Sequence, residues 1–253
     1  MVICNSLAVI YASPDYTSEQ VDEMLYGEEA TVLAEENGFY KIRSEYDYVG
    51  WTPKTNLFPK SKDPNFRINC IFSDLLVEGR YHYEPFMALP RGAKLNVEFS
   101  ENSYRYAYVS HPNEFTFYIH KNHLTALEEK QYTEQELRER FAETAKEYLG
   151  VQYRWGGRSH KGIDCSGLCF NAYWFNGYTL WRDANIDRST ILRKIPLEEA
   201  KKGDLLFFKG HVAMCLGDGN IIHASASVGN VAIERLKDKE WLLNNFVGAG
   251  TVF

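Results

Sequence analysis

The sequence contains no long apolar run. None of its stretches approaches the roughly 18 consecutive apolar residues needed to cross a bilayer, so no membrane span is expected. It also has no excess of basic charge, because 28 Lys and Arg residues stand against 34 Asp and Glu residues. A net charge of −6 gives no electrostatic attraction to nucleic acid or to an anionic membrane, and neither is expected as a partner.

Cysteine is scarce and odd in number. The five cysteines fit a reducing compartment with mostly buried thiols better than a disulfide scaffold. Cys165 and Cys169 have no second ligand pair, and the histidines show no metal-ligand spacing with them, so no metal site is expected. The apolar N-terminal stretch lacks a basic flank and is interrupted by polar residues, and we interpret it as a first strand and not as a signal peptide.

Charge and pattern divide the chain into unlike parts. Residues 1–127 carry 11 basic and 17 acidic side chains, whereas residues 128–253 carry 17 of each. Short strands with turn residues between them, typical of a small barrel or sandwich, extend to residue 58. A polar, proline-bounded linker follows, and then a second set of strands begins. The expected strands are Val2 to Ala12, Ala30 to Glu35, Phe39 to Ser44, Tyr48 to Thr52, Phe66 to Phe72, Lys94 to Phe99, Tyr104 to Ser110 and Phe115 to Ile119.

The two strand sets end alike. The stretch from Tyr118 to Leu124 repeats an aromatic residue, a lysine and a leucine at the offsets found from Trp51 to Leu57. This similarity indicates a weak internal duplication of about 60 residues.

Helical spacing begins after Tyr132. Thr133-Glu-Gln-Glu136 predicts a capping box, and apolar residues follow at helical intervals until Gly150. A second helix is expected from Ser166 to Phe175. Further strands are expected at Asp204 to Lys209, His211 to Leu216, Asn220 to Ala226, Val231 to Leu236 and Val247 to Phe253. The predicted domains are residues 1–60, 65–127 and 128–253, two small β modules followed by an α+β domain.

Cys165 is the strongest candidate for a reactive residue. It stands in Gly162-Ile-Asp-Cys-Ser-Gly167, at the start of the second predicted helix. A thiol at this position faces unpaired backbone N–H groups and the positive end of the helix dipole, and both favour the thiolate. We interpret the other four cysteines as small buried apolar residues.

A cysteine nucleophile needs a base and a group that orients the base. His211 and His223 lie on two predicted strands joined at Gly217-Asp-Gly219. If Asp218 and Gly219 alone form the turn, the two histidines fall on opposite faces of the sheet. If all three residues form the loop, Ala213 pairs with His223, and His211 lies diagonally across on the same face.

At these residues the sequence resembles the NlpC-type cell-wall cysteine peptidases, a papain-like superfamily. The blocks that carry the resemblance occur in the family's order: Tyr148-Leu-Gly-Val-Gln-Tyr-Arg-Trp-Gly-Gly157, Ile163-Asp-Cys-Ser-Gly-Leu168, Gly203-Asp-Leu-Leu-Phe-Phe208, Gly210-His-Val212 and Ile222-His-Ala-Ser225. The likeness covers about 120 C-terminal residues strongly. The two N-terminal modules look like bacterial SH3-type barrels. With Trp181-Arg-Asp-Ala184, the layout is most similar to the branch that cuts the D-γ-glutamyl–diamino acid bond of free muropeptides.

The resemblance implies roles for particular residues. Cys165 would be the nucleophile, His211 the base and His223 the residue that orients it. Tyr153 would stabilise the tetrahedral oxyanion together with the backbone N–H of Cys165. Four further positions would contribute to the substrate groove: Asp164 and Ser166 beside the nucleophile, Asp183 as the partner of a free α-amine, and Tyr48 from the first module.

The resemblance thus implies a γ-D-glutamyl-L-diamino acid endopeptidase of the papain-like α+β fold, preceded by two SH3-like barrels. We expect a monomer or weakly associating protein that needs no cofactor and releases L-Ala-γ-D-Glu from stem peptides. A cytoplasmic role in murein peptide recycling is expected, unless an export signal has been removed. A thiol-dependent amidase or acyltransferase, and a catalytically idle wall-binding protein, remain as alternatives.

Overall fold

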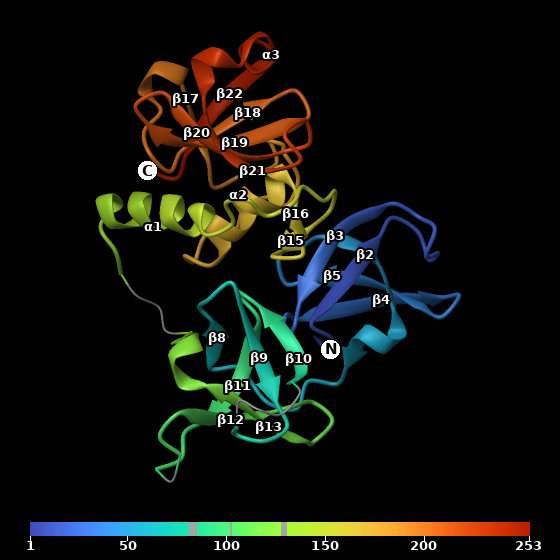
Figure 1. The fold of residues 1–253 in the computed structure, drawn as a ribbon. Helices are drawn as coiled ribbons and strands as arrows, with labels where there is room; N and C mark the ends of the chain where they lie inside the picture. Colours follow the sequence, from blue (N-terminus) through green and yellow to red (C-terminus); the bar gives the residue numbers. More distant parts are fainter. Residues whose placement is uncertain (81–84, 102, 128–130) are drawn as a thin grey trace. The chain divides into compact units, whose positions relative to one another are not determined.

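The computed structural model describes residues 1–80, 85–101, 103–127 and 131–253 (Figure 1). The chain forms two compact units, residues 1–128 and 129–253. Within the described ranges, no helix is long and apolar enough to cross a membrane.

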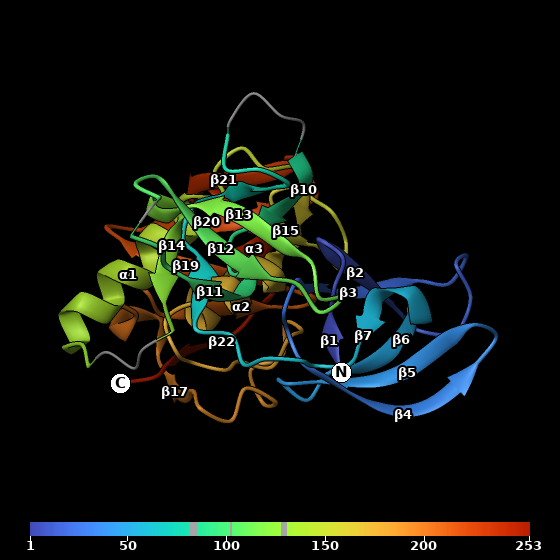
Figure 2. The same cartoon turned by 90° about the horizontal axis from the view of Figure 1, so that it is seen from below.

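The first sheet of the N-terminal unit has five antiparallel strands in the order β3-β2-β6-β5-β4. They are β2 (Leu7–Tyr11), β3 (Gln20–Leu25), β4 (Ala30–Glu36), β5 (Phe39–Ser44) and β6 (Val49–Pro53). Strand β1 (Val2–Ile3), which precedes this sheet in sequence, pairs with β7 (Leu57–Phe58), which follows it. In Figure 2, β4 and β5 form a long hairpin whose outer strand is an edge of the sheet.

Two expectations for this sheet are corrected. The single strand expected from Val2 to Ala12 is divided by a bend at Asn5 and Ser6. The sequence pattern also missed β3, because this strand buries the acidic residues Asp22 and Glu23. The Tyr46 hydroxyl donates a hydrogen bond of 2.6 Å to the Asp22 carboxylate, which compensates its burial.

The second sheet of this unit has seven strands in the order β10-β9-β13-β12-β11-β8-β14. They are β8 (Phe66–Ile68), β9 (Phe72–Leu76), β10 (Pro85–Pro90), β11 (Lys94–Glu98), β12 (Tyr106–Ser110), β13 (Thr116–His120) and β14 (Leu124–Ala126). The strand expected from Phe66 to Phe72 ends at Ile68, so β9 was missed apart from its first residue. Strand β10 was also missed, because a proline stands at each of its ends, where proline normally indicates a loop.

The expected duplication has a structural counterpart. A 3-10 turn, η1 (Lys54–Asn56), follows β6, and a matching turn, η2 (Lys121–His123), follows β13. Each turn leads into a short closing strand, β7 or β14. The shared aromatic, lysine and leucine positions therefore mark the same local structure in both halves of the unit.

The two sheets of the first unit are tightly joined at one point. Tyr26, which follows β3, is buried among apolar side chains of the second sheet. The Lys94 N–H donates a hydrogen bond of 2.8 Å to the Tyr26 carbonyl. Gly27 has a φ of +77°, and a Cβ there would overlap the Lys94 carbonyl oxygen. Only glycine fits this junction without strain.

The second unit has two main helices and a six-stranded antiparallel sheet. Helix α1 (Glu134–Lys146) begins with the expected capping box, in which Thr133 and Glu136 bond reciprocally. Helix α2 (Cys165–Trp174) packs against α1 and against β19 and β20. The sheet runs in the order β17-β22-β18-β19-β20-β21. Its strands are β17 (Arg193–Ile195), β18 (Leu205–Phe208), β19 (His211–Gly217), β20 (Asn220–Ser225), β21 (Asn230–Arg235) and β22 (Phe246–Thr251).

Smaller elements complete this unit. A two-stranded pair, β15 (Arg158–Ser159) and β16 (Gly162–Ile163), precedes α2. The turns η3 (Leu197–Glu199) and η4 (Leu236–Asp238) and the short helix α3 (Glu240–Asn244) connect the later strands. Figure 1 shows α1 and α2 together on one side of the sheet. Stacked rings of Phe141 and Tyr173, 4.1 Å apart, hold the two helices together.

Candidate active site

Cys165 is the first residue of α2, and the local sequence fixes that position. Asp164 caps the helix, with its Oδ1 accepting a hydrogen bond of 2.6 Å from the Gly167 N–H. Glycine is required at position 167, since a Cβ there would overlap the Gly157 carbonyl oxygen. The sulfur lies close to the sheet as well, because the Val212 N–H hydrogen-bonds to it. Cys165 is 6% exposed.

Asp164 differs from the expectation of a groove-lining carboxylate. It is buried, and its oxygens also accept hydrogen bonds from the Gly156 N–H (2.8 Å) and the Ser166 hydroxyl (3.1 Å). Arg182 makes a two-pronged ion pair with it, Nη1 to Oδ1 at 3.1 Å and Nη2 to Oδ2 at 3.2 Å. The carboxylate is therefore occupied in holding the start of α2, and Ser166 is half-buried beside it.

Sequence reasoning missed Arg182. Its guanidinium is 1% exposed and donates to the Ser166 hydroxyl at 2.9 Å as well as to Asp164. A buried arginine is retained when its donors are matched by a carboxylate. The sequence did offer one indication of this residue, because Arg182 directly precedes Asp183 in the block Trp181-Arg-Asp-Ala184.

His211 and His223 lie on the same face of neighbouring strands. His211 Nε2 and His223 Nδ1 are 2.8 Å apart, and His223 is 3% exposed. The pairing of Met214 with Ile222 continues the pattern that sets Ala213 opposite His223. The expected register is therefore present.

The expected three-residue loop is not what produces this register. Gly217 pairs with Asn220, so Asp218 and Gly219 form a two-residue turn, and both have a positive φ, of 52° and 74°. A bulge between Cys215 and Gly217 then shifts the ladder by one residue. Gly217 itself has a φ of +86°, which a glycine tolerates.

Sequence reasoning also missed Glu234. His223 pairs with Ala232 on β21, so Glu234 is its diagonal neighbour on the same face. The Glu234 Oε2 lies 2.8 Å from His223 Nε2, and its Oε1 is ion-paired with Lys239. The alternation of side chains along β21 places Glu234 on the same face as Ala232. This indicates a contact with His223 only when the pairing of β20 with β21 is known.

The two hydrogen bonds of His223 limit where the protons of both imidazoles can lie. Salt bridging to Lys239 and the hydrogen bond from His223 lower the pKa of Glu234 against the effect of burial, so its carboxylate only accepts hydrogen bonds. If both imidazoles are neutral, this geometry requires His223 to donate from Nε2 and accept at Nδ1. His211 must then donate from Nε2, which leaves its Nδ1 unprotonated and able to take a proton.

Burial governs the charge state of Cys165, the candidate nucleophile. It raises the pKa of the Cys165 thiol to about 12, with the Asp164 charge adding to the effect. Burial and the neighbouring His223 lower the pKa of His211 to about 4. The N–H groups at the start of α2 lower this pKa, as expected from the sequence, but desolvation outweighs them. Burial thus favours a neutral thiol beside a neutral imidazole.

A cavity of about 630 Å³ opens beside the two histidines. Tyr153 and the exposed indoles of Trp155 and Trp241 contribute to its wall, together with His211, His223 and Glu234. Burial and the nearby Cys165 raise the pKa of Tyr153 to about 12, so its hydroxyl stays protonated and can donate a hydrogen bond.

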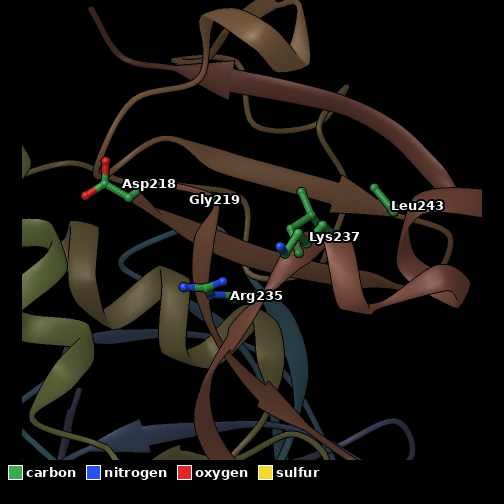
Figure 3. A pocket seen from close by; sticks show the side chains of 6 residues that line it. Asp218, Gly219, Arg235, Lys237 and Leu243 are labelled. Atoms are coloured by element: carbon green, nitrogen blue, oxygen red, sulfur yellow. The ribbon is translucent and has the colours of Figure 1, made fainter.

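A separate cavity of about 400 Å³ lies at the turn between β19 and β20 (Figure 3). Asp218, Arg235 and Lys237 are among its lining residues, none of which lines the cavity at the histidines. In the described ranges, no group of three or more His, Cys, Asp or Glu side chains could hold a metal ion.

Asp183 and Tyr48 are the two remaining expected site residues. Asp183 is exposed in the loop after Arg182, and its carboxylate accepts a hydrogen bond of 3.2 Å from the Trp181 indole. Tyr48 is half-buried in the turn between β5 and β6 of the first unit, where its N–H donates to the Ser44 hydroxyl at 3.0 Å. The roles of both in substrate binding stay predictions.

Comparison with known sequences finds two domain families. The NlpC/P60 family matches residues 150–249, and the bacterial dipeptidyl-peptidase SH3 domain matches residues 10–57. Neither of these two matches covers the second sheet of the first unit, so the SH3-like fold of that sheet stays a prediction.

Curated relatives match along most of the chain. A protein of Lysinibacillus sphaericus named dipeptidyl-peptidase 6 is 33% identical over 249 residues, which cover 94% of this chain and 92% of that protein. A Bacillus cereus protein named gamma-D-glutamyl-L-lysine dipeptidyl-peptidase is 28% identical over 233 residues, 83% of this chain and 69% of that protein.

Among solved structures, an NlpC/P60 family protein from Bacillus cereus has the same fold. It superposes with a TM-score of 0.84 at 22% sequence identity, covering 98% of this chain and 97% of that one. The arrangement of Cys165, His211 and His223 therefore lies within a fold already seen in this group.

Proposed function

The chain belongs to the NlpC/P60 family and is a cysteine peptidase, and from that premise we propose that it cleaves the γ-D-glutamyl–diamino acid bond of peptidoglycan stem peptides. Its substrate has a free N-terminal L-alanine, and the product is L-Ala-γ-D-Glu. This reaction would serve the recycling of murein peptides in the cytoplasm. The names of the two relatives support this specificity. The observation that carries the proposal is the 2.8 Å hydrogen bond between His211 and His223 beside the start of α2.

Acylation begins from the neutral pair. The Cys165 sulfur attacks the γ-carbonyl carbon of D-glutamate while its proton passes to Nδ1 of His211. Because the thiolate is not formed beforehand, proton transfer and attack occur together. The Cys165 N–H and the Tyr153 hydroxyl donate hydrogen bonds to the oxyanion of the tetrahedral intermediate.

The intermediate collapses by loss of the diamino acid. The imidazolium of His211 returns the proton to the leaving nitrogen, the C–N bond breaks, and a thioester on Cys165 remains. Water then gives a proton to His211 as it attacks the thioester carbon. The C–S bond breaks, the proton returns to the sulfur, and L-Ala-γ-D-Glu leaves.

Asp183 supports selection for an unblocked N-terminus. Its exposed carboxylate follows Arg182, which contacts Ser166 next to the nucleophile. An ammonium group of L-alanine would pair with this carboxylate, whereas an acylated nitrogen would leave it without that partner.

Mass spectrometry of the products of L-Ala-γ-D-Glu-L-Lys tests the proposal. We expect the wild type to release L-Ala-γ-D-Glu and the Cys165→Ala variant to release none. The same peptide with an acetylated N-terminus should be cleaved at least about tenfold more slowly. Equal cleavage of both peptides would contradict the free-amine requirement, and cleavage at another bond would contradict the proposed specificity.

A further inference from the structure

The catalytic histidines continue into a longer chain of polar groups. Three strands contribute one residue each, His211 on β19, His223 on β20 and Glu234 on β21, and each is a diagonal neighbour of the next. Both hydrogen bonds in the chain measure 2.8 Å. Lys239, placed directly after the η4 turn, ends the chain by its ion pair with Glu234.

The charges around His223 come from several elements. Burial lowers the pKa of His223 below its usual value, Glu234 opposes this shift, and Lys239 adds to it. Asp238 and Glu240, which flank Lys239, line the same cavity.

His211 has its own surroundings at the start of α2. The Asp164 charge raises its pKa against the stronger effects of burial and of His223. Of all these carboxylates, Glu234 is the one that the structure hydrogen-bonds to His223.

We propose that Glu234 is a positioning residue that fixes the proton of His223 on Nε2, and that Lys239 holds its carboxylate in place for this role. The inference rests on the proposed peptidase function. With the proton on Nε2, His223 Nδ1 accepts from His211 Nε2, and His211 Nδ1 stays free for the thiol proton. When His211 becomes an imidazolium, the Glu234 carboxylate stabilises the positive charge through His223.

Glutamine at position 234 provides a sharp test, because it keeps one oxygen and replaces the other by a donor. Lys239 can only donate, so it competes with His223 for the single amide oxygen. If Lys239 takes it, the amide N–H₂ faces His223 Nε2 and forces the proton to Nδ1. An imidazole held in the wrong tautomer disables a catalytic triad.

The measurement is kcat/KM for L-Ala-γ-D-Glu-L-Lys in a small set of variants. We expect Glu234→Gln to lose at least about tenfold, as for other residues that orient an active-site histidine. The double variant Glu234→Gln/Lys239→Met should recover at least about threefold over Glu234→Gln, since the amide oxygen is then free to face His223. Lys237→Met, which changes an exposed lysine of the separate cavity in Figure 3, should match the wild type.

The pH dependence separates this role from a purely structural one. Glu234→Ala removes a charge that favours protonated His223, so the acid limb of kcat/KM should move to lower pH. Lys239→Met removes a charge that opposes protonation, so the limb should move to higher pH. Losses without movement of the limb, or a double variant no better than Glu234→Gln, would overturn the proposal.

A readout without substrate keeps the two proposals distinguishable. Nitrogen-15 shifts of the imidazoles should show His223 protonated on Nε2 in the wild type and on Nδ1 in Glu234→Gln. Unchanged tautomers in Glu234→Gln would overturn the positioning role even if the wild type cleaves the peptide. Failure of the wild type to release L-Ala-γ-D-Glu would instead overturn the proposed function.

Discussion

The position of Cys165 sets its reactivity at the scale of single residues. The thiol is nearly inaccessible in the free protein, and burial raises its pKa to about 12. The helix N-terminus and the Val212 N–H act in the opposite direction, but the loss of solvation is larger. We therefore expect ionisation of the thiol to accompany substrate binding and proton transfer to His211.

Alkylation of the free protein by iodoacetamide should report this state. The rate at Cys165 is expected to rise about tenfold per pH unit between pH 7 and pH 9, because the thiolate fraction rises in that proportion below the pKa. Peptide mapping by mass spectrometry separates Cys165 from the other four thiols, and Cys165→Ala identifies its adduct. A rate that is already constant above pH 6 would contradict a neutral resting pair.

The ion pair of Arg182 with Asp164 leads to a prediction on stability. Arg182→Met removes the partner of a buried carboxylate, and the free energy of unfolding of the second unit should fall by about 3–5 kcal/mol. Arg188→Met is the matched control, since its guanidinium lies exposed over the Trp181 ring and is worth about 1 kcal/mol at most. Urea unfolding followed by tryptophan fluorescence measures both. Equal effects of the two changes would contradict the structural role of Arg182.

At the scale of elements, the β19–β20 hairpin decides whether the histidines meet. A bulge at Leu216, next to Gly217 with its positive φ, corrects the register that the two-residue turn alone would impose. The site therefore depends on one extra residue in one strand.

Gly217→Val should disturb the site through this bulge. A β-branched residue disfavours the positive φ by about 1–2 kcal/mol, which favours the regular ladder with the histidines on opposite faces. We expect at least about tenfold lower kcat/KM, because the base loses its orienting partner. Deletion of Leu216 removes the extra residue but keeps Met214 opposite Ile222, so it should retain more activity than Gly217→Val. The opposite ranking would contradict this account of the register.

The elements also show what the sequence could and could not predict. Helix α1 with its capping box and the strands that carry the histidines follow from local patterns, because capping and alternation act over a few residues. Strand β3 was not predicted because Asp22 and Glu23 are buried there, and the hydrogen-bond partner of Asp22, Tyr46, is distant in sequence. The sequence also did not predict the roles of Arg182 and Glu234. Arg182 meets Asp164, and Glu234 meets His223, only after the loop and the sheet have folded.

At the scale of the whole molecule, residues 1–128 form one compact unit, whose two sheets meet at Tyr26 and Gly27. Gly27→Ala places a Cβ against the Lys94 carbonyl oxygen in a left-handed backbone conformation. We expect the free energy of unfolding of residues 1–128 to fall by at least about 2 kcal/mol. Hydrogen exchange measured by mass spectrometry on the full chain should show faster exchange in both sheets of this unit.

A control for that substitution lies in the β4–β5 turn. Gly38 also has a positive φ, of 80°, but a Cβ there meets nothing within 4 Å. Gly38→Ala should therefore carry only the backbone cost of about 1 kcal/mol. Similar exchange in the two variants would show that contact with Lys94 contributes little.

The burial of the Cys165 sulfur should also slow its oxidation. Hydrogen peroxide reacts with thiolates, and sulfenic acid forms fastest on exposed cysteines of low pKa. A thiol that is 6% exposed, and whose pKa is raised by burial, offers peroxide little thiolate to attack. The enzyme should therefore survive an oxidative burst that inactivates cysteine enzymes with a standing thiolate.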